Sequence, residues 1–197
     1  MTRVLITGPT GFIGAHCLEA LLARGGDEIH AVNRSGRGPH AERVTWHGAD
    51  LRSPEQAAHL VERVRPTHLL HGAWEATPGA YAQSPENLDW LQGSLALIRS
   101  FARHGGVRFV GVGSSAEYDP GAGPCIEDET PLRPASIYGQ CKLACWLALD
   151  AASRAPEFAA AQARAGLLNV EHVGRVALRK MLDEGFDLAD KFAKDLV

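Results

Sequence analysis

The octamer Thr7-Gly8-Pro9-Thr10-Gly11-Phe12-Ile13-Gly14 decides the fold of this chain. A short apolar run precedes it, and a helical pattern over residues 15–24 follows it. Gly8 can adopt the positive φ of a tight turn, Gly11 lets the backbone approach a phosphate, and Gly14 lets the helix pack closely on the strand. The helix start then presents unpaired N–H groups to an anion. Glycines alone would indicate an ordinary turn, but between a strand and a helix they predict dinucleotide binding.

The composition is that of a globular domain. Of the 197 residues, 45% are hydrophobic and 22% are charged. The net charge of −3 provides no basic field for nucleic acid or for an anionic membrane. No apolar run is long enough to span a bilayer, and the sequence passes into a strand without a signal peptide. We therefore expect a cytoplasmic protein that binds neither nucleic acid nor membrane.

The cysteines and histidines do not indicate a metal site. Four cysteines stand at positions 17, 125, 141 and 145, and no two of them form a CxxC pair. The histidines are scattered without ligand spacing. Cys141 and Cys145 share a helix face, which favours buried, reduced thiols. We expect no metal.

Strand and helix patterns alternate along the chain. Strands are predicted at residues 3–7, 28–32, 44–47 and 108–112, with a further strand ending in residues 69–74, and helices at 12–24, 54–65, 84–103 and 136–155. This alternation predicts an α/β fold, a Rossmann-type doubly wound parallel sheet that binds ligands at the carboxyl ends of its strands.

The pattern changes after Pro156. We expect residues 1–155 to form the dinucleotide-binding domain and residues 156–197 to form an irregular helical tail, with helices at 157–165, 170–183 and 186–196. No sixth strand is predicted.

Tyr138 and Lys142 lie four residues apart, so they share one face of a helix. An ammonium near a phenol lowers the phenol pKa from its usual value of about 10. Such a tyrosine can exchange a proton with a carbonyl oxygen while a hydride moves. Lys142 could also hold a ribose. Taken alone, the spacing is much more often that of a surface Tyr–Lys pair.

Further motifs stand in a fixed order around this pair. They are TGxxGxxG at residues 7–14, Asp50-Leu51, His71-Gly72-Ala73-Trp74, Ser114-Ser115-Ala116-Glu117-Tyr118, Glu129-Thr130-Pro131 and YxxxK at residues 138–142. With these motifs the sequence resembles the extended short-chain dehydrogenase/reductase group, the NAD(P)-dependent epimerase/dehydratase family, which acts mostly on nucleotide sugars.

The resemblance implies roles for particular residues. Tyr138 would be the acid/base and Lys142 its tuner, and Ser114 would hydrogen-bond the reacting oxygen, with Ser115 as the runner-up. Either serine could instead cap a loop at the end of a strand. Asp50 and Leu51 would meet the adenine, and Ala73 the nicotinamide ribose. The remaining implied cofactor contacts are Gly8, Thr10, Gly11, Phe12, Ile13, Gly14, Tyr138 and Lys142.

The end of the second strand bears on cofactor choice. In a site that prefers NAD, a carboxylate at this position accepts hydrogen bonds from the ribose hydroxyls. This chain has Asn33 and Arg34, with Arg37 nearby and no acid before Glu42. A guanidinium suits a 2′-phosphate, which favours NADP(H) over NAD(H). The alternative is that Arg34 stacks on adenine and that the arginines are solvated.

Two departures qualify the resemblance. Trp90 stands where the family usually has an asparagine, and residues 156–197 match little of the family's substrate lobe. We expect an NAD(P)-dependent oxidoreductase or epimerase acting on a keto-deoxy nucleotide sugar or a similar carbonyl compound. The alternative is a non-catalytic NAD(P)-binding module, such as a sensor, scaffold or partner subunit.

The resemblance also implies a homodimer through helices 84–103 and 136–155. Leu88, Leu91, Leu95 and Ile98 supply an apolar stripe on the first of these helices. The alternative is that the stripe packs on the sheet.

Overall fold

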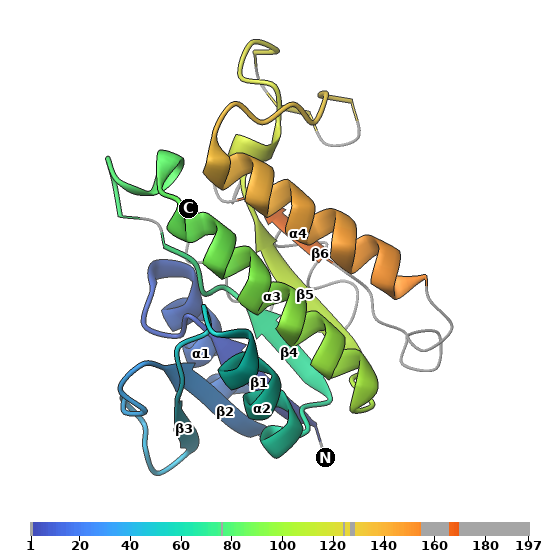
Figure 1. Cartoon of the computed structure of the whole chain (residues 1–197). Coiled ribbons are helices and arrows are strands. Elements are labelled where there is room, and N and C mark those ends of the chain that lie inside the picture. Colours follow the sequence, from blue (N-terminus) through green and yellow to red (C-terminus); the bar gives the residue numbers. More distant parts are fainter. Residues whose placement is uncertain (1, 76, 124, 127–128, 155–165, 170–197) are drawn as a thin grey trace.

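Six parallel strands form the centre of the molecule, in the order β3-β2-β1-β4-β5-β6 (Figure 1). The computed structural model describes residues 2–75, 77–123, 125–126, 129–154 and 166–169. The strands are β1 Arg3–Thr7, β2 Glu28–Asn33, β3 Val44–Gly48, β4 His68–His71, β5 Arg108–Gly113 and β6 Gly166–Asn169. The helices are α1 Phe12–Arg24, α2 Pro54–Val64, α3 Glu86–Arg103 and α4 Ile137–Ser153, with 3₁₀ turns η1 Tyr81–Gln83 and η2 Ser115–Glu117. The doubly wound parallel sheet predicted from the sequence is confirmed.

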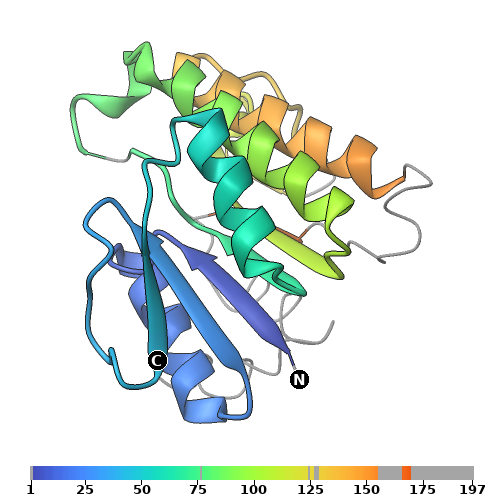
Figure 2. The ribbon, with the colours of Figure 1, turned by 60° about the horizontal axis from the view of Figure 1, so that its bottom comes forward.

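Helices cover both faces of the sheet (Figure 2). Helix α1 lies on one face, and α2, α3 and α4 lie on the other. Successive side chains of a strand point to opposite faces, so Val4 and Ile6 pack with α1 whereas Leu5 packs with α2 and α3. No helix in the described part of the chain is long and apolar enough to cross a membrane.

The strand order reverses at β1. Its last residue, Thr7, pairs with Val32 of β2 on one side and with His71 of β4 on the other. The chain winds outward from β1 in both directions, which leaves a crevice above the carboxyl ends of β1 and β4. The glycine turn follows β1 directly, so it lies at this crevice.

The sixth strand corrects our expectation. Gly166–Asn169 pairs in parallel with residues 110–113 of β5, where we predicted none. A four-residue strand is too short to show a period of its own between two helical patterns. The predicted helices at 157–165, 170–183 and 186–196 lie outside the described residues.

Gly93 sets how closely α3 approaches the loop before α2. A Cβ at this position would lie 1.7 Å from the carbonyl oxygen of Leu51. We predict that Gly93→Ala lowers the free energy of unfolding by about 2–4 kcal/mol, because helix and loop must separate. The matched control is Gly111→Ala, whose Cβ would make an ordinary 3.7 Å contact with Leu149. Urea unfolding measures both variants, and equal losses would contradict the prediction.

Candidate functional site

The glycine turn has the geometry that its sequence predicts. Gly8 has a φ of 71°, and a Cβ there would lie 2.8 Å from the backbone of Gly72 and Ala73. Gly11 is the N-cap of α1 and provides no side-chain cap, so the first helical turn keeps its N–H groups for a ligand. A Cβ at Gly14 would lie 2.0 Å from the carbonyl oxygen of Gly8. Gly14 therefore packs α1 against the turn itself rather than against the strand.

A cavity of about 310 Å³ opens beside this turn. Eight predicted cofactor residues line it: Gly8, Thr10, Gly11, Asn33, Arg34, Asp50, Leu51 and Ala73. Six do not: Phe12, Ile13, Gly14, Arg37, Tyr138 and Lys142. Phe12 is 78% exposed, and Ile13 packs against the core beside α1. The structure thus brings together the residues predicted from the turn and from the ends of β2, β3 and β4.

The cavity also contains residues to which we assigned no role. They are Val32, Ala49, Arg52, Gly72, Trp74, Glu75, Glu86 and Trp90. The dipeptide Asp50-Leu51 pointed to this loop, but nothing in the sequence marked Arg52. Trp90 was identified only because it stands where the family usually has an asparagine.

Asn33 organises the loop after β2. Its Oδ1 accepts from the Gly36 N–H at 2.7 Å and from the Ser35 hydroxyl at 3.0 Å, and its Nδ2 donates to the Arg37 carbonyl at 2.8 Å. The polar atoms of the Asn33 side chain are therefore engaged within the loop. Arg34 is exposed at the cavity wall, so its guanidinium is the cationic group that this loop presents there.

Arg52 holds the carboxylate of Asp50. Its Nε lies 3.1 Å from Oδ1 and its Nη2 lies 2.8 Å from Oδ2, while Nη1 reaches Glu86 at 3.2 Å. Hydrogen bonding from Arg52 lowers the pKa of Asp50 below its usual value. The carboxylate thus stays ionised and fixed, and the pair links the β3–α2 loop to the first turn of α3.

A buried hydrogen-bond chain crosses the ends of β1, β4 and α3. The Ala73 N–H donates to Thr7 Oγ1 at 3.1 Å, and Thr7 Oγ1 lies 2.8 Å from His71 Nδ1. His71 Nε2 lies 2.8 Å from Ser94 Oγ, which donates to the Trp90 carbonyl at 2.7 Å.

The directions of these hydrogen bonds assign the tautomer of His71. The Ser94 hydroxyl has one proton and gives it to Trp90, so His71 donates from Nε2 and accepts at Nδ1. Burial, reinforced by the charge of Lys142, lowers the pKa of His71 to about 3. The imidazole ring of His71 is therefore uncharged near neutral pH.

Lys142 is buried at the end of β5. Its Nζ donates to the Val112 carbonyl at 2.5 Å and lies 4.4 Å from the centre of the Trp74 ring. Burial lowers the pKa of Lys142. Tyr138, one helical turn earlier, contacts Trp74 and Tyr81 edge-to-face, with ring centres 6.3 Å and 4.7 Å apart. Both predicted groups thus lie in an aromatic cluster.

Ser114 starts a capping box on η2. Its Oγ accepts from the Ala116 N–H at 3.2 Å, and its own N–H donates to Glu117 Oε1 at 2.7 Å. The loop-capping alternative for this serine is therefore real, although a hydroxyl that accepts one bond still has a proton to donate. Ser115, the runner-up, is half-buried in η2.

Gly139 brings α4 onto this turn. A Cβ at Gly139 would lie 2.1 Å from the carbonyl oxygen of Ala116. Only a glycine allows the helix to pack this closely, and Tyr138 precedes it in the chain. The close approach places the predicted tyrosine beside the turn that begins at Ser114.

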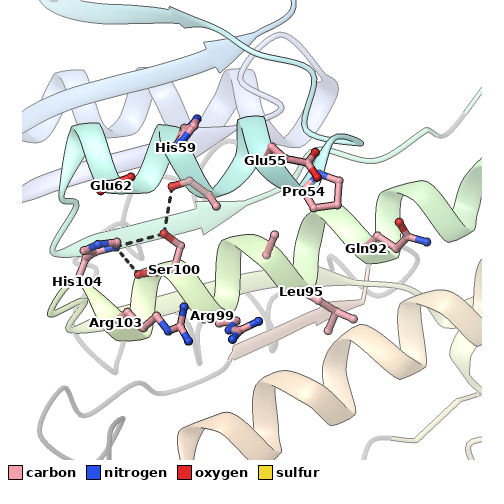
Figure 3. Close-up of a pocket in the computed structure, with 12 residues that line it drawn as sticks. Pro54, Glu55, His59, Glu62, Gln92, Leu95, Arg99, Ser100, Arg103 and His104 are labelled. Carbon is pink, nitrogen blue, oxygen red and sulfur yellow. Dashed lines mark hydrogen bonds between the residues drawn. The ribbon is translucent and has the colours of Figure 1, made fainter.

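A larger cavity of about 770 Å³ lies between α2 and α3, on their outer side (Figure 3). Ser100 and His104 line it, and their proximity resembles a catalytic pair. However, the Ser100 hydroxyl donates to the Ala58 carbonyl at 3.1 Å, and His104 Nδ1 lies 2.9 Å from the Ser100 carbonyl. Ser100 Oγ also lies 3.2 Å from His104 Nδ1 (Figure 3), but that nitrogen donates to the Ser100 carbonyl and so cannot accept the proton of the hydroxyl.

Glu117 generates a prediction about pH. The residue is 1% exposed, and burial raises its pKa from 4.5 to about 7 despite the opposing effects of the Ser114 N–H and Lys142. Between these values the folded state holds a proton that the unfolded state has lost, so Glu117 makes stability fall as pH rises from 4.5 to 7. The loss amounts to at most about 3 kcal/mol.

Glu117→Gln keeps the acceptor oxygen but cannot titrate. We predict that its free energy of unfolding, relative to that of the unsubstituted protein, rises steadily between pH 4.5 and pH 7. Urea titrations across this range measure the difference, and a constant difference would show that Glu117 ionises normally. All other ionisable residues are the same in the two proteins, so the difference isolates Glu117.

Comparisons with known proteins identify the family of this chain. The profile of the NAD dependent epimerase/dehydratase family matches residues 4–177. A UDP-glucose 4-epimerase of Neisseria meningitidis serogroup C is 29% identical over 154 residues, which cover 72% of this chain and 45% of that protein. The NAD(+)-dependent dTDP-6-deoxy-L-talose 4-dehydrogenase of Aggregatibacter actinomycetemcomitans is 30% identical over 147 residues, covering 71% and 51%. The chain thus spans about half the length of these curated relatives.

A solved structure shows the same fold. The UDP-glucose 4-epimerase of Thermus thermophilus, in complex with NAD, superposes with a TM-score of 0.71 at 25% identity. The alignment covers 93% of this chain and 62% of that one. Since the family profile matches most of the sequence and the cavity lies where its glycine motif predicts, the chain belongs to the NAD-dependent epimerase/dehydratase family.

Proposed function

We propose that this chain acts as an NAD(P)-dependent oxidoreductase or epimerase of the short-chain dehydrogenase type. Its substrate would be a keto-deoxy nucleotide sugar or a similar carbonyl compound. The observation that carries the proposal is the close packing of Gly139 on Ala116. It gathers Tyr138, Lys142 and Ser114 at the same end of the sheet as the glycine turn.

The cavity beside the turn fits a dinucleotide. Three features support this fit: an uncapped helix N-terminus, a tight turn whose Gly8 packs directly on the backbone after β4, and the paired carboxylate of Asp50. Gly8 and Gly11 would lie along the phosphates and Asp50 and Leu51 along the adenine. When bound, the cofactor supplies a nicotinamide ring that gives or takes a hydride.

Tyr138 would hold and transfer the proton at its phenolic oxygen. The ammonium of Lys142, one helical turn away, favours the phenolate electrostatically. Trp74 and Tyr81 pack around the phenol ring and exclude water from it, which strengthens that interaction. Ser114 would donate its hydroxyl proton to the reacting oxygen, with Ser115 as the second candidate.

We further propose a preference for NADP(H) over NAD(H). The end of β2 presents Arg34 rather than a carboxylate, and the polar atoms of Asn33 are engaged in the loop. An arginine can pair with the two charges of a 2′-phosphate. The Aggregatibacter dehydrogenase depends on NAD(+) and the Thermus epimerase binds NAD, so this preference would distinguish the chain from both.

The chain would form a homodimer through α3 and α4, which lie side by side (Figure 1). Leu88 and Leu95 of α3 are 53% and 39% exposed, and Leu147 of α4 is 50% exposed. Ile98 is buried, so the predicted stripe divides between the core and the surface. The exposed leucines are the part available to a second copy.

We predict that Tyr138→Phe reduces turnover at least ~100-fold while cofactor affinity changes little, because only the proton-transferring hydroxyl is lost. NADPH oxidation with 4-keto-6-deoxy nucleotide sugars measures turnover, and calorimetry measures affinity. Tyr118→Phe removes the hydroxyl of a buried tyrosine outside the assigned set and serves as the control. Turnover unchanged by the Tyr138 substitution would refute the mechanism, and binding without any turnover would indicate a non-catalytic module.

Arg34→Ala tests the cofactor preference. We predict that it weakens NADPH binding about tenfold and leaves NADH binding nearly unchanged, because only NADPH has the phosphate. Arg37→Ala should have the smaller effect, since Arg37 does not line the cavity. Calorimetric titration of both nucleotides measures the four affinities. An equal loss for the two nucleotides at Arg34 would indicate stacking on adenine instead.

A further inference from the structure

The indole of Trp74 lies between the cavity beside the glycine turn and the pair Tyr138 and Lys142. Trp74 lines this cavity, whereas Tyr138 and Lys142 do not. The centre of its ring lies 4.4 Å from Lys142 Nζ, and the ring contacts that of Tyr138 edge-to-face, with centres 6.3 Å apart. One side chain therefore forms a wall of the cavity and covers both groups that the proposed reaction would use.

Two further contacts hold the indole in this position. Its Nε1 donates to Asn87 Oδ1 at 2.8 Å, and the Asn87 amide donates to the carbonyls of Tyr81 and Ser84 at 2.6 and 2.8 Å. The ring also stacks on that of Trp90, with centres 6.2 Å apart and planes at 25°. Because Asn87 is buried and bonded on both sides of its amide, it holds the indole N–H in a fixed direction.

The ammonium of Lys142 is enclosed by its neighbours. The side chain is buried, its Nζ donates to the Val112 carbonyl, and the ring of Trp74 lies over it. The proposed function assigns Lys142 a ribose of the cofactor as well as an effect on Tyr138. That ribose can reach the ammonium only if one of the present neighbours moves. The Val112 carbonyl belongs to strand β5, so the side chain of Trp74 is the neighbour that can leave.

The features that fit a nucleotide all belong to one half of a dinucleotide. The glycine turn would lie along the phosphates, Asp50 and Leu51 along the adenine, and Arg34 beside the adenosine ribose. The cavity that joins these residues measures about 310 Å³, near the lower end of the range for small-molecule sites. The open part of the site thus provides for adenosine diphosphate, and Trp74 separates it from Lys142.

We propose that Trp74 determines how much of a dinucleotide this site accepts. With the ring over Lys142, the site takes an adenosine diphosphate group, with or without a 2′-phosphate. The nicotinamide riboside reaches Lys142 and Tyr138 only when the ring moves away. The inference rests on the proposed function, which places a dinucleotide in the cavity. Moving the ring breaks its hydrogen bond to Asn87 and its contact with the ammonium, and these losses offset the contacts that the nicotinamide half makes.

The test compares each dinucleotide with the fragment that lacks the nicotinamide riboside. NADH is paired with ADP, and NADPH is paired with 2′-phospho-ADP. Trp74→Ala removes the ring and keeps the residues expected to contact the adenosine half. Trp46→Ala is the matched control, since Trp46 donates to the Pro39 carbonyl and does not line the cavity. Calorimetry measures the four affinities of each protein.

We expect Trp74→Ala to shift the ratio of affinities about tenfold in favour of the dinucleotide over its fragment, and Trp46→Ala to leave that ratio unchanged. An unchanged ratio in Trp74→Ala would overturn the inference and leave the proposed function standing. If the unsubstituted protein binds none of the four compounds, the proposed function fails and the inference fails with it.

A second readout uses the unsubstituted protein, labelled with ¹⁵N-tryptophan. The indole proton of Trp74 should exchange faster with solvent in the dinucleotide complex than in the fragment complex, because only the dinucleotide breaks its bond to Asn87. The indole proton of Trp46, which is bonded to the Pro39 carbonyl, should exchange equally in both complexes. Equal exchange rates for Trp74 in the two saturated complexes would overturn the inference.

Discussion

Backbone meets backbone without intervening side chains at the carboxyl end of this sheet, and the site depends on that contact. Gly8 lies against Gly72 and Ala73, and Gly14 lies against Gly8. A methyl group at either position would push β1 from β4 or α1 from the turn. Since the cavity lies between these segments, its width is set by the absence of side chains. The positive φ of Gly8 turns the chain at this point.

Polar bonds then fix what the glycines bring together. Thr7, His71 and Ser94 link two strands to α3 through bonds of 2.8 Å. Burial, together with the charge of Lys142, keeps the imidazole neutral by lowering the pKa of His71, so the ring has one donor and one acceptor for its two partners. The same series of hydrogen bonds includes the Ala73 N–H and the Trp90 carbonyl, and both of these residues line the cavity. The neutral imidazole of His71 thus positions residues of the cavity without changing its charge near neutral pH.

The sequence predicted strands β1 to β5 and helices α1 to α4 because these elements have clear periods and caps. Ser53 caps α2 by accepting from the Gln56 N–H, as its position before Pro54 predicts. The glycine turn was predicted equally well, since Gly8 and Gly14 occupy positions where a Cβ would clash with the backbone. Contacts between distant segments could not be predicted from the sequence. The bidentate bond from Arg52 to Asp50 and the packing of Gly93 on Leu51 leave no periodic signal, and β6 is too short to have one.

Lys142 is buried beside polar and aromatic partners rather than beside a full negative charge. An ammonium removed from water is costly unless it finds acceptors nearby, and Lys142 finds the Val112 carbonyl and the face of Trp74. Neither carries a full negative charge. Glu117 interacts electrostatically with Lys142, but burial raises the pKa of Glu117 to about 7, so near neutrality it supplies only part of a charge. The site therefore retains a net positive character beside Tyr138. In the proposed mechanism, a phenolate at Tyr138 would supply the negative charge that Lys142 lacks, and the ammonium would stabilise it in return.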